Sequence, residues 1–281
     1  MKTRPLAFAL LFVLIAFTAN FLTAQVTQDV AGAGMINWSN QMIRATGIGA
    51  PNPAMPVTAQ RAGAIEAAKR VALRNLLETV QGMSLTSEVT VRNAMVENDV
   101  IMTKVQGVVK AFTVVDTKYM STGDVEVTVE MPVTGALMDA LLPQQISGQT
   151  TPQGQMPMQT PQAQQQQSGV FTGLIVDGRG LGIRPAMAPK IVDESGSEIY
   201  GSKNIDRDWA VKIGMVGYEK DLDRAKTNDR VTNNPLVVKG TKTSGANKAD
   251  LVVANDAAAQ IRNAAANQNF LNQCKVMFIV D

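Results

Sequence analysis

The chain has 281 residues, of which 45% are hydrophobic and 18% charged, and its formal net charge is +2. This length accommodates two ordinary domains and a linker. Histidine is absent, which excludes Ser–His and Cys–His nucleophiles as well as histidine-based zinc sites. Basic residues are scattered rather than clustered, so the charge pattern gives no reason to expect a nucleic acid as partner.

Residues 1–24 are predicted to be a signal peptide. Lys2 and Arg4 form a basic start, and Leu6–Phe17 is an apolar run without charge. The run is short for a membrane span, and small residues before Gln25 suit cleavage, although an uncleaved anchor is the alternative. We therefore expect export, and without residues 1–24 the net charge falls from +2 to zero.

The single cysteine, Cys274, lies near the C-terminus among apolar residues. One cysteine cannot form an internal disulfide, so the exported chain must be held by its packed cores. A buried structural thiol is a better interpretation of Cys274 than a reactive one. Gln25, and not a cysteine, is the residue at the predicted cleavage site, so we expect no direct lipid anchor.

Residues 25–142 are predicted to form a helix-on-sheet module. Before the helix, Ile43 and Ile48 flank a short strand that ends in a corner at 47–49. An alanine-rich helix then begins with Thr58 as N-cap and ends at Gly82 as a left-handed C-cap. Apolar residues recur in it at threes and fours, at Ala62, Ile65, Ala68, Ala72, Leu76 and Val80. Small residues in its first half predict a close approach to a sheet.

After the helix, alternation predicts strands over 85–91, 105–119 and 125–131, with Gly107 as a bulge or close-approach point in the second of them. The ambiguous stretch 94–103 could be a short helix with four inward residues, Met95, Val96, Val100 and Ile101. The turn at 121–124 makes the last two strands an antiparallel hairpin, covered by the helix. A short helix over 135–142 closes the module.

Residues 143–168 are predicted to be a disordered linker. The stretch consists mainly of Gln, Pro, Thr, Gly and Met and contains no charged residue. Such a composition buries too little apolar surface to offset the entropy lost on ordering.

Residues 169–281 are predicted to form a small α/β domain with a mixed sheet, which makes the whole chain α+β. A strand ends at Asp177, a glycine corner follows, and a turn at 193–196 makes a hairpin. Further strands are expected at 236–240, 251–254 and 276–280, with a helix over 257–265. Trp38 and Trp209 are interpreted as core or domain-interface anchors.

Two patterns in this domain suggest chemistry only superficially. Gly178, Gly180 and Gly182 are spaced G-x-G-x-G and precede Ile-Arg-Pro, whereas a dinucleotide turn needs G-x-G-x-x-G and a helix start. Asp177, Asp193 and Glu194 form no calcium-loop pattern, and two of them lie in a turn. We therefore predict no catalytic, metal-binding or cofactor-binding residue and no enzymatic activity.

With no catalytic or ligand-binding site predicted, we expect the chain to act by recognising other proteins through its surfaces. In the second domain, the expected interaction surface is the glycine corner and its continuation toward Ile191, comprising Gly178, Arg179, Gly180, Gly182, Arg184 and Pro185. In the first domain, it is the edge of the predicted hairpin.

The helix carries a recognisable motif at 64–82, A-x-x-A-A-x-x-x-A-x-x-N-L-L-E-x-V-x-G. With the segments that follow, it resembles the N-terminal module of flagellar assembly protein T and of related bacterial twenty-kilodalton lipoproteins. Residues 169–281 resemble the C-terminal half of uncharacterised exported proteins that carry this module. The resemblance implies a non-enzymatic envelope protein, either a periplasmic building block of rings around the flagellar basal body or an outer-membrane-attached component.

Together these features predict an exported structural or assembly component of a Gram-negative periplasm, associated with the outer membrane only through other proteins. Its partners would be envelope proteins or further copies of itself. The alternative is a periplasmic protein that binds a carbohydrate or other small molecule between its domains.

Overall fold

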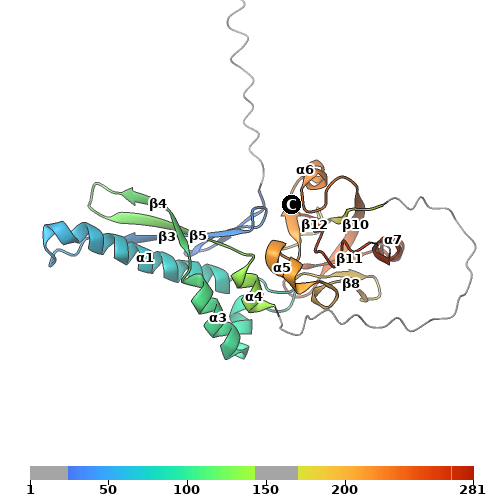
Figure 1. Cartoon of the computed structure of the whole chain (residues 1–281), viewed down its shortest axis with the longest axis horizontal. Helices are drawn as coiled ribbons and strands as arrows, with labels where there is room; N and C mark the ends of the chain where they lie inside the picture. The colour runs from blue at the N-terminus through green and yellow to red at the C-terminus, as the bar shows by residue number, and fades with distance from the viewer. Residues whose placement is uncertain (1–24, 143–169, 267) are drawn as a thin grey trace, which may run out of the picture.

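A computed structural model describes residues 25–142, 170–266 and 268–281, which form two sheets with their helices (Figure 1). We call the part before residue 143 the first domain and the part after residue 169 the second domain. The predicted signal peptide (1–24) and linker (143–168) lie outside these residues. The helices and two sheets confirm the α+β prediction, with a helix on an antiparallel sheet first and a mixed sheet second.

The first domain contains a five-stranded antiparallel sheet in the order β1-β2-β3-β5-β4. Its strands are β1 (Thr27–Val30), β2 (Gly34–Asn37), β3 (Met42–Gly49), β4 (Thr113–Tyr119) and β5 (Val125–Pro132). Its helices are α1 (Val57–Gln81), α2 (Val91–Glu97), α3 (Asp99–Val109) and α4 (Ala136–Leu141). The predicted hairpin is confirmed, because β4 pairs antiparallel with β5.

Helix α1 lies directly on β3 because both surfaces are built from small residues. A Cβ atom on Gly47 would lie 2.2 Å from the Ala72 nitrogen, and one on Gly49 would lie 2.1 Å from the Ala64 oxygen. Neither distance is compatible with a side chain, so only glycine allows the helix this close. The predicted corner at 47–49 is therefore wrong, since both glycines continue a regular strand.

The predicted N-cap of α1 is wrong, and Gly82 is confirmed as its C-cap residue but not as a left-handed one. The helix begins at Val57 after Pro56, and no side chain in the described part of the chain caps its first turn. Gly82 has a φ of −74°, in the right-handed region. The buried stripe also runs through Ala64 rather than Ala62, which is exposed, because β3 approaches the helix from that side.

The predicted strand at 85–91 is wrong, and the predicted strand at 105–119 is confirmed only from Thr113 on, because 105–109 belong to a helix. Residues 84–90 form a loop with one isolated bridge, Ser84 to Thr90. The Thr90 hydroxyl accepts from the Asn93 N–H at 3.2 Å, and the Asn98 side chain caps α3 in the same way. These caps start α2 and α3 and carry the chain helically through Gly107, which is no bulge.

The inward face predicted for 94–103 is only partly confirmed. Met95 is buried, whereas Val96 and Val100 are 79% and 62% exposed. The break between α2 and α3 at Asn98 rotates these two valines outward, which a continuous helical periodicity does not anticipate.

The second domain is built on a seven-stranded mixed sheet in the order β8-β7-β11-β10-β6-β12-β9. Its strands are β6 (Gly173–Asp177), β7 (Ile191–Asp193), β8 (Glu198–Tyr200), β9 (Gly217–Glu219), β10 (Pro235–Ser244), β11 (Asp250–Val253) and β12 (Val276–Ile279). Its helices are α5 (Arg207–Ile213), α6 (Leu222–Thr227) and α7 (Asn255–Ala266), with a 3-10 turn at Ser202–Asn204. The predicted mixed sheet and the β7–β8 hairpin are confirmed.

The two domains share a hydrophobic core. One continuous buried cluster includes Ile36 and Trp38 of the first domain and Tyr218 and Phe278 of the second. Trp38 contacts Tyr218 edge to face, with ring centroids 5.6 Å apart. Such a pair adds to the burial energy of both rings, so the prediction of Trp38 as a domain-interface anchor is confirmed.

Candidate functional site

The loop between α1 and α2 is hydrogen-bonded to the second domain through its backbone. The Met187 N–H donates to the Ser84 carbonyl at 3.0 Å, and the Ala188 N–H donates to the Leu85 carbonyl at 2.7 Å. The Asn247 N–H donates to the Ser87 carbonyl at 2.7 Å. The second domain thus satisfies backbone carbonyls that the predicted strand would have paired within the first domain.

A buried polar contact accompanies these backbone bonds. The Ser87 hydroxyl donates to an Asp250 carboxylate oxygen at 2.5 Å, and the Lys190 N–H donates to the other oxygen at 2.8 Å. Ser87 and Asp250 are 4% and 7% exposed. Burial raises the pKa of Asp250, so docking of the domains is coupled to the charge of this carboxyl group.

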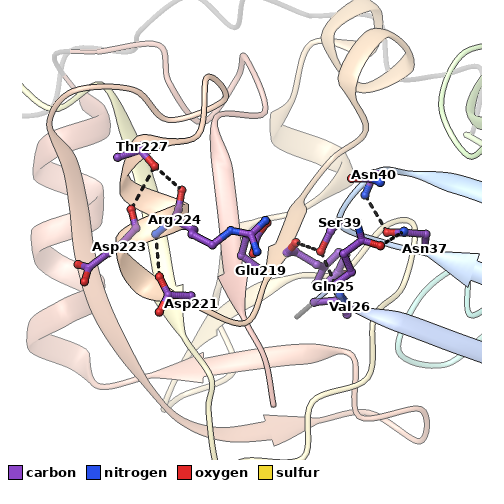
Figure 2. A network of polar contacts seen from close by, with 11 residues as sticks. Gln25, Val26, Asn37, Ser39, Asn40, Glu219, Asp221, Asp223, Arg224 and Thr227 are labelled. Carbon is purple, nitrogen blue, oxygen red and sulfur yellow. Dashed lines mark hydrogen bonds and ion pairs between the residues drawn. The ribbon is translucent and has the colours of Figure 1, made fainter. Parts of the chain in front are cut away.

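A second polar contact crosses the domain boundary beside Trp38. The Ser39 hydroxyl donates to the Tyr218 carbonyl and accepts from the Val26 N–H, both at 3.0 Å (Figure 2). Further from this point, Arg207 forms an ion pair with Asp139 at 2.7 Å. The boundary is therefore held at separate points along its length.

A pocket of about 360 Å³ opens beside Ser39, at the domain boundary where the alternative prediction placed a ligand. Ser39 and Gln41 line it from the first domain. Trp209, Lys212, Arg230 and Lys275 line it from the second, and we call this space the interdomain pocket. Lys212 lies 5.3 Å from the centre of the Trp209 ring, within range of a cation–π interaction.

The interdomain pocket is electropositive. Lys212 and Lys275 form no ion pair within the described residues, and Asp229 is the only acidic group in the pocket lining. Arg230 donates to the carbonyls of Ile213, Gly214 and Cys274, and burial lowers its pKa. Arg230 thus holds the end of α5 in place, while the two lysines are available to an anionic group.

The glycine corner predicted as an interaction surface lies at the end of β6. Arg179 forms an ion pair with Asp177 at 2.6 Å and lowers its pKa, and the Gly180 N–H donates to the Asp281 side chain at 2.7 Å. Gly180 and Gly182 have φ values of 76° and 64°, which glycine adopts without strain. Their conformation supports the interpretation of the segment as a structural corner.

The predicted surface residues differ in accessibility. Arg179, Gly180, Gly182 and Arg184 are exposed, whereas Gly178 is buried and Pro185 is partly buried. Beyond Pro185, residues 186–189 are buried and bonded to the loop at 84–85, so this part of the expected surface is already occupied by the first domain.

The three carboxylates considered for catalysis are not brought together. Asp177 ends β6, whereas Asp193 ends β7, and β10 and β11 lie between these strands. Asp193 accepts from Arg262, Ser195 and Ser197, which hold its pKa well below its usual range. The Glu194 side chain accepts from the Asn255 N–H at 3.3 Å. Their contacts are those of a turn and a helix start.

Strand β4 is the third candidate surface, as the sequence predicted for the hairpin edge. It is the last strand of the first sheet, and its side chains are exposed except for Thr117, which is partly exposed. Val115 and Tyr119 are 44% and 57% exposed. The β4–β5 turn lies at the end of the first domain away from the second (Figure 1), so this edge is open in the described structure.

Sequence reasoning missed Ser87, Asp250, Lys212, Arg230 and Lys275. They are single polar residues far apart in the chain, and no local motif marks them. Across residues 25–142, 170–266 and 268–281, no group of acidic or thiol side chains is arranged to hold a metal ion. The same segments contain no helix long and apolar enough to cross a membrane.

Comparison with known families gives one match. Residues 173–281 match the model of the second domain of Treponema pallidum Tp0624. The match runs from the first residue of β6 to the end of the chain, so it coincides with the second domain of the fold. No curated protein matches the chain.

Proposed function

We propose that this chain is an exported, non-enzymatic component of a Gram-negative cell envelope that acts in structure or assembly. The observation that carries the proposal is the exposed β4 edge, where apolar side chains accompany an open strand. Edge strands of this kind pair readily with an added strand, and soluble proteins usually protect them. The apolar run at the N-terminus and the family resemblance support export and an envelope role.

The docking of the two domains supports this role physically. The shared core and the bonds around Ser87 join the domains, and β4 projects from the far end of that unit. A partner that adds a strand to a preformed edge loses less conformational entropy than one that must order a loop. The chain is thereby suited to presenting a fixed edge for assembly.

We place the protein in the periplasm, associated with the outer membrane through protein partners rather than a lipid. Site-specific photo-crosslinking in cells tests this proposal. A photoreactive residue at Val115 should yield adducts with the chain itself or with identified envelope proteins. The same residue at Val96, which is 79% exposed on α2, provides the control. Equal labelling from both positions would contradict the proposal.

The flagellar branch of the proposal rests on the resemblance and has its own test. A strain lacking the gene should lose swimming motility and a basal-body ring if the chain belongs to the flagellum. Normal motility with intact rings in electron micrographs would remove this branch and leave a general envelope role.

A second function is favoured by the interdomain pocket, where Lys212 and Lys275 are free of ion pairs within the described residues. It would bind a small anion, such as an acidic sugar or a phosphorylated compound. Because a ligand stabilises the folded state by mass action, a thermal-shift screen should reveal it as a raised melting temperature. Lys212→Gln combined with Lys275→Gln should abolish the shift, and a flat screen of the unmodified chain would exclude this function.

A further inference from the structure

The outer side of β4 has a defined set of available backbone groups. At the hairpin turn, the Met120 N–H donates to the Asp124 carbonyl at 2.9 Å, so the backbone of Met120 faces β5. Backbone groups of successive strand residues alternate in direction, so Thr117 and Tyr119 present their N–H and C=O groups outward. The register shift between Val114 and Asp116 marks a bulge at Val115, and a regular edge follows it.

Helix α1 leaves space above this edge. It packs over β3 and β5, and it reaches β4 through Arg61, whose guanidinium lies 5.0 Å from the centre of the Tyr119 ring. A strand added beside β4 would extend the sheet without meeting the body of the helix. The edge is therefore open both in its backbone groups and on the helix side of the sheet.

The side chains of β4 are complementary to themselves in one antiparallel register. Opposite residues must lie on the same face of the sheet. A two-fold axis between two antiparallel edges must therefore pass between the two copies of one residue, and we name each register by that residue. An axis through Thr117 places Asp116 opposite Lys118 of the second copy, twice. It also brings Val115, at the bulge, next to Tyr119 of the second copy. Val115 and Tyr119 are both among the exposed large hydrophobic side chains.

Neighbouring registers lose this complementarity. An axis through Asp116 places two carboxylates opposite each other, and an axis through Lys118 does the same with two ammonium groups. Like charges directly opposite each other destabilise an antiparallel pair, whereas opposite charges stabilise it. Only the Thr117 axis combines charge pairing with exchange of the outward backbone groups of Thr117.

We propose that two copies of this chain pair antiparallel through their β4 edges, with Thr117 on the two-fold axis. The pairing joins two five-stranded sheets into one continuous sheet, with both α1 helices on the same face. This inference rests on the proposed assembly function and names a second copy as the partner of the edge. Burying Val115 against Tyr119 of the second copy removes apolar surface from water at both ends of the paired segment.

Charge exchange in β4 tests the register. The full chain, purified after export, should dimerise with rising concentration in sedimentation velocity. Asp116→Lys alone creates lysine pairs across the axis, and Lys118→Asp alone creates aspartate pairs. Each should weaken the dimer about tenfold or more. Glu66→Lys, an equal change of charge on exposed α1, should leave dimerisation unchanged.

Mixing the two single variants provides the decisive measurement. Two lysines of one chain then face two aspartates of the other, so a heterodimer should form although each variant alone is largely monomeric. The combined exchange, Asp116→Lys with Lys118→Asp, should restore the homodimer. A folding defect cannot produce this pattern, and circular dichroism checks the fold of each variant.

A wild-type chain that stays monomeric up to millimolar concentration, or a mixture that does not dimerise, would overturn the inference. If the Val115 crosslinker then captures a different envelope protein in cells, the assembly function stands and only the second copy is wrong as the partner. If it captures neither, both the inference and the proposed function fall.

Discussion

Strand β5 has two neighbours with opposite surroundings. On one side, β3 buries alternate residues under α1 and contains the two glycines that meet the helix backbone. On the other side, β4 carries two valines and a tyrosine and exposes all three. Both strands have apolar residues and both pair with the same strand. The extent of the covering helix therefore decides which apolar strand becomes core and which becomes an edge.

The largest loss of stability should follow from a substitution in β3, the strand that α1 covers. Gly47→Val would place side-chain atoms within the van der Waals radius of the α1 backbone, where neither element can yield easily. We expect a loss of about 3 kcal/mol or more in the free energy of unfolding, measured by urea denaturation. Gly107→Ala is the control. It meets open space within α3 and should be neutral or stabilise by about 0.5 kcal/mol.

The loop at 84–87 is a second covered segment, because the second domain covers its backbone. Ser87→Ala removes the donor to Asp250 and leaves a buried carboxylate with one bond fewer. We expect a loss of about 1–3 kcal/mol, measured by denaturation, together with faster hydrogen exchange in both domains at their boundary. Unchanged exchange at the Ala188 amide would show that Ser87 does not contribute to docking.

The same contact predicts a dependence of stability on pH. Burial raises the pKa of Asp250 above its ordinary value of 3.8, so the folded chain binds the proton more tightly than the unfolded chain. This contribution is fully present below pH 3.8 and is lost as the pH rises through the folded pKa. Lys190 and Glu88 are the other charges that act on this group. The melting temperature of the unmodified chain, relative to Asp250→Asn, should therefore be highest at acid pH and fall toward neutrality.

The smallest changes in stability are expected around β4, the strand that α1 leaves uncovered. Arg61→Ala removes the cation from the Tyr119 ring and should cost about 0.5–1 kcal/mol, measured by thermal unfolding. Val115→Thr should change stability by less than about 0.5 kcal/mol, because the valine is already 44% exposed. A large loss from Val115→Thr in dilute, monomeric protein would mean that β4 belongs to the core after all.

Periodicity predicted elements well where one face of an element is buried along its length. Alternation in β5 and the turn before β8 correctly identified two hairpins. It failed at 85–91, where an alternating stretch forms a loop bonded to the second domain, and at 105–109, where valines four residues apart complete a helix. In both stretches the local pattern suits two conformations, and contacts distant in sequence select between them.

The candidate sites also differ in whether the sequence alone predicts them. The hairpin edge was predictable, because it follows from strands that are neighbours in sequence. The interdomain pocket was not, since its lysines and Arg230 come from separate elements and are joined only when α5, β9 and the residues around Ser39 meet.

By itself, the sequence determined the α+β class, the long small-residue helix, the principal hairpins and the burial of Cys274, whose pKa rises to about 11 because the thiol is desolvated. These features depend on spacing along a single segment. Only the tertiary structure decided that Gly47 and Gly49 meet the helix, that Ser87 docks against Asp250, and that β4 stays uncovered. The physical reason is that packing distance, backbone satisfaction and burial are set by segments that are remote in sequence.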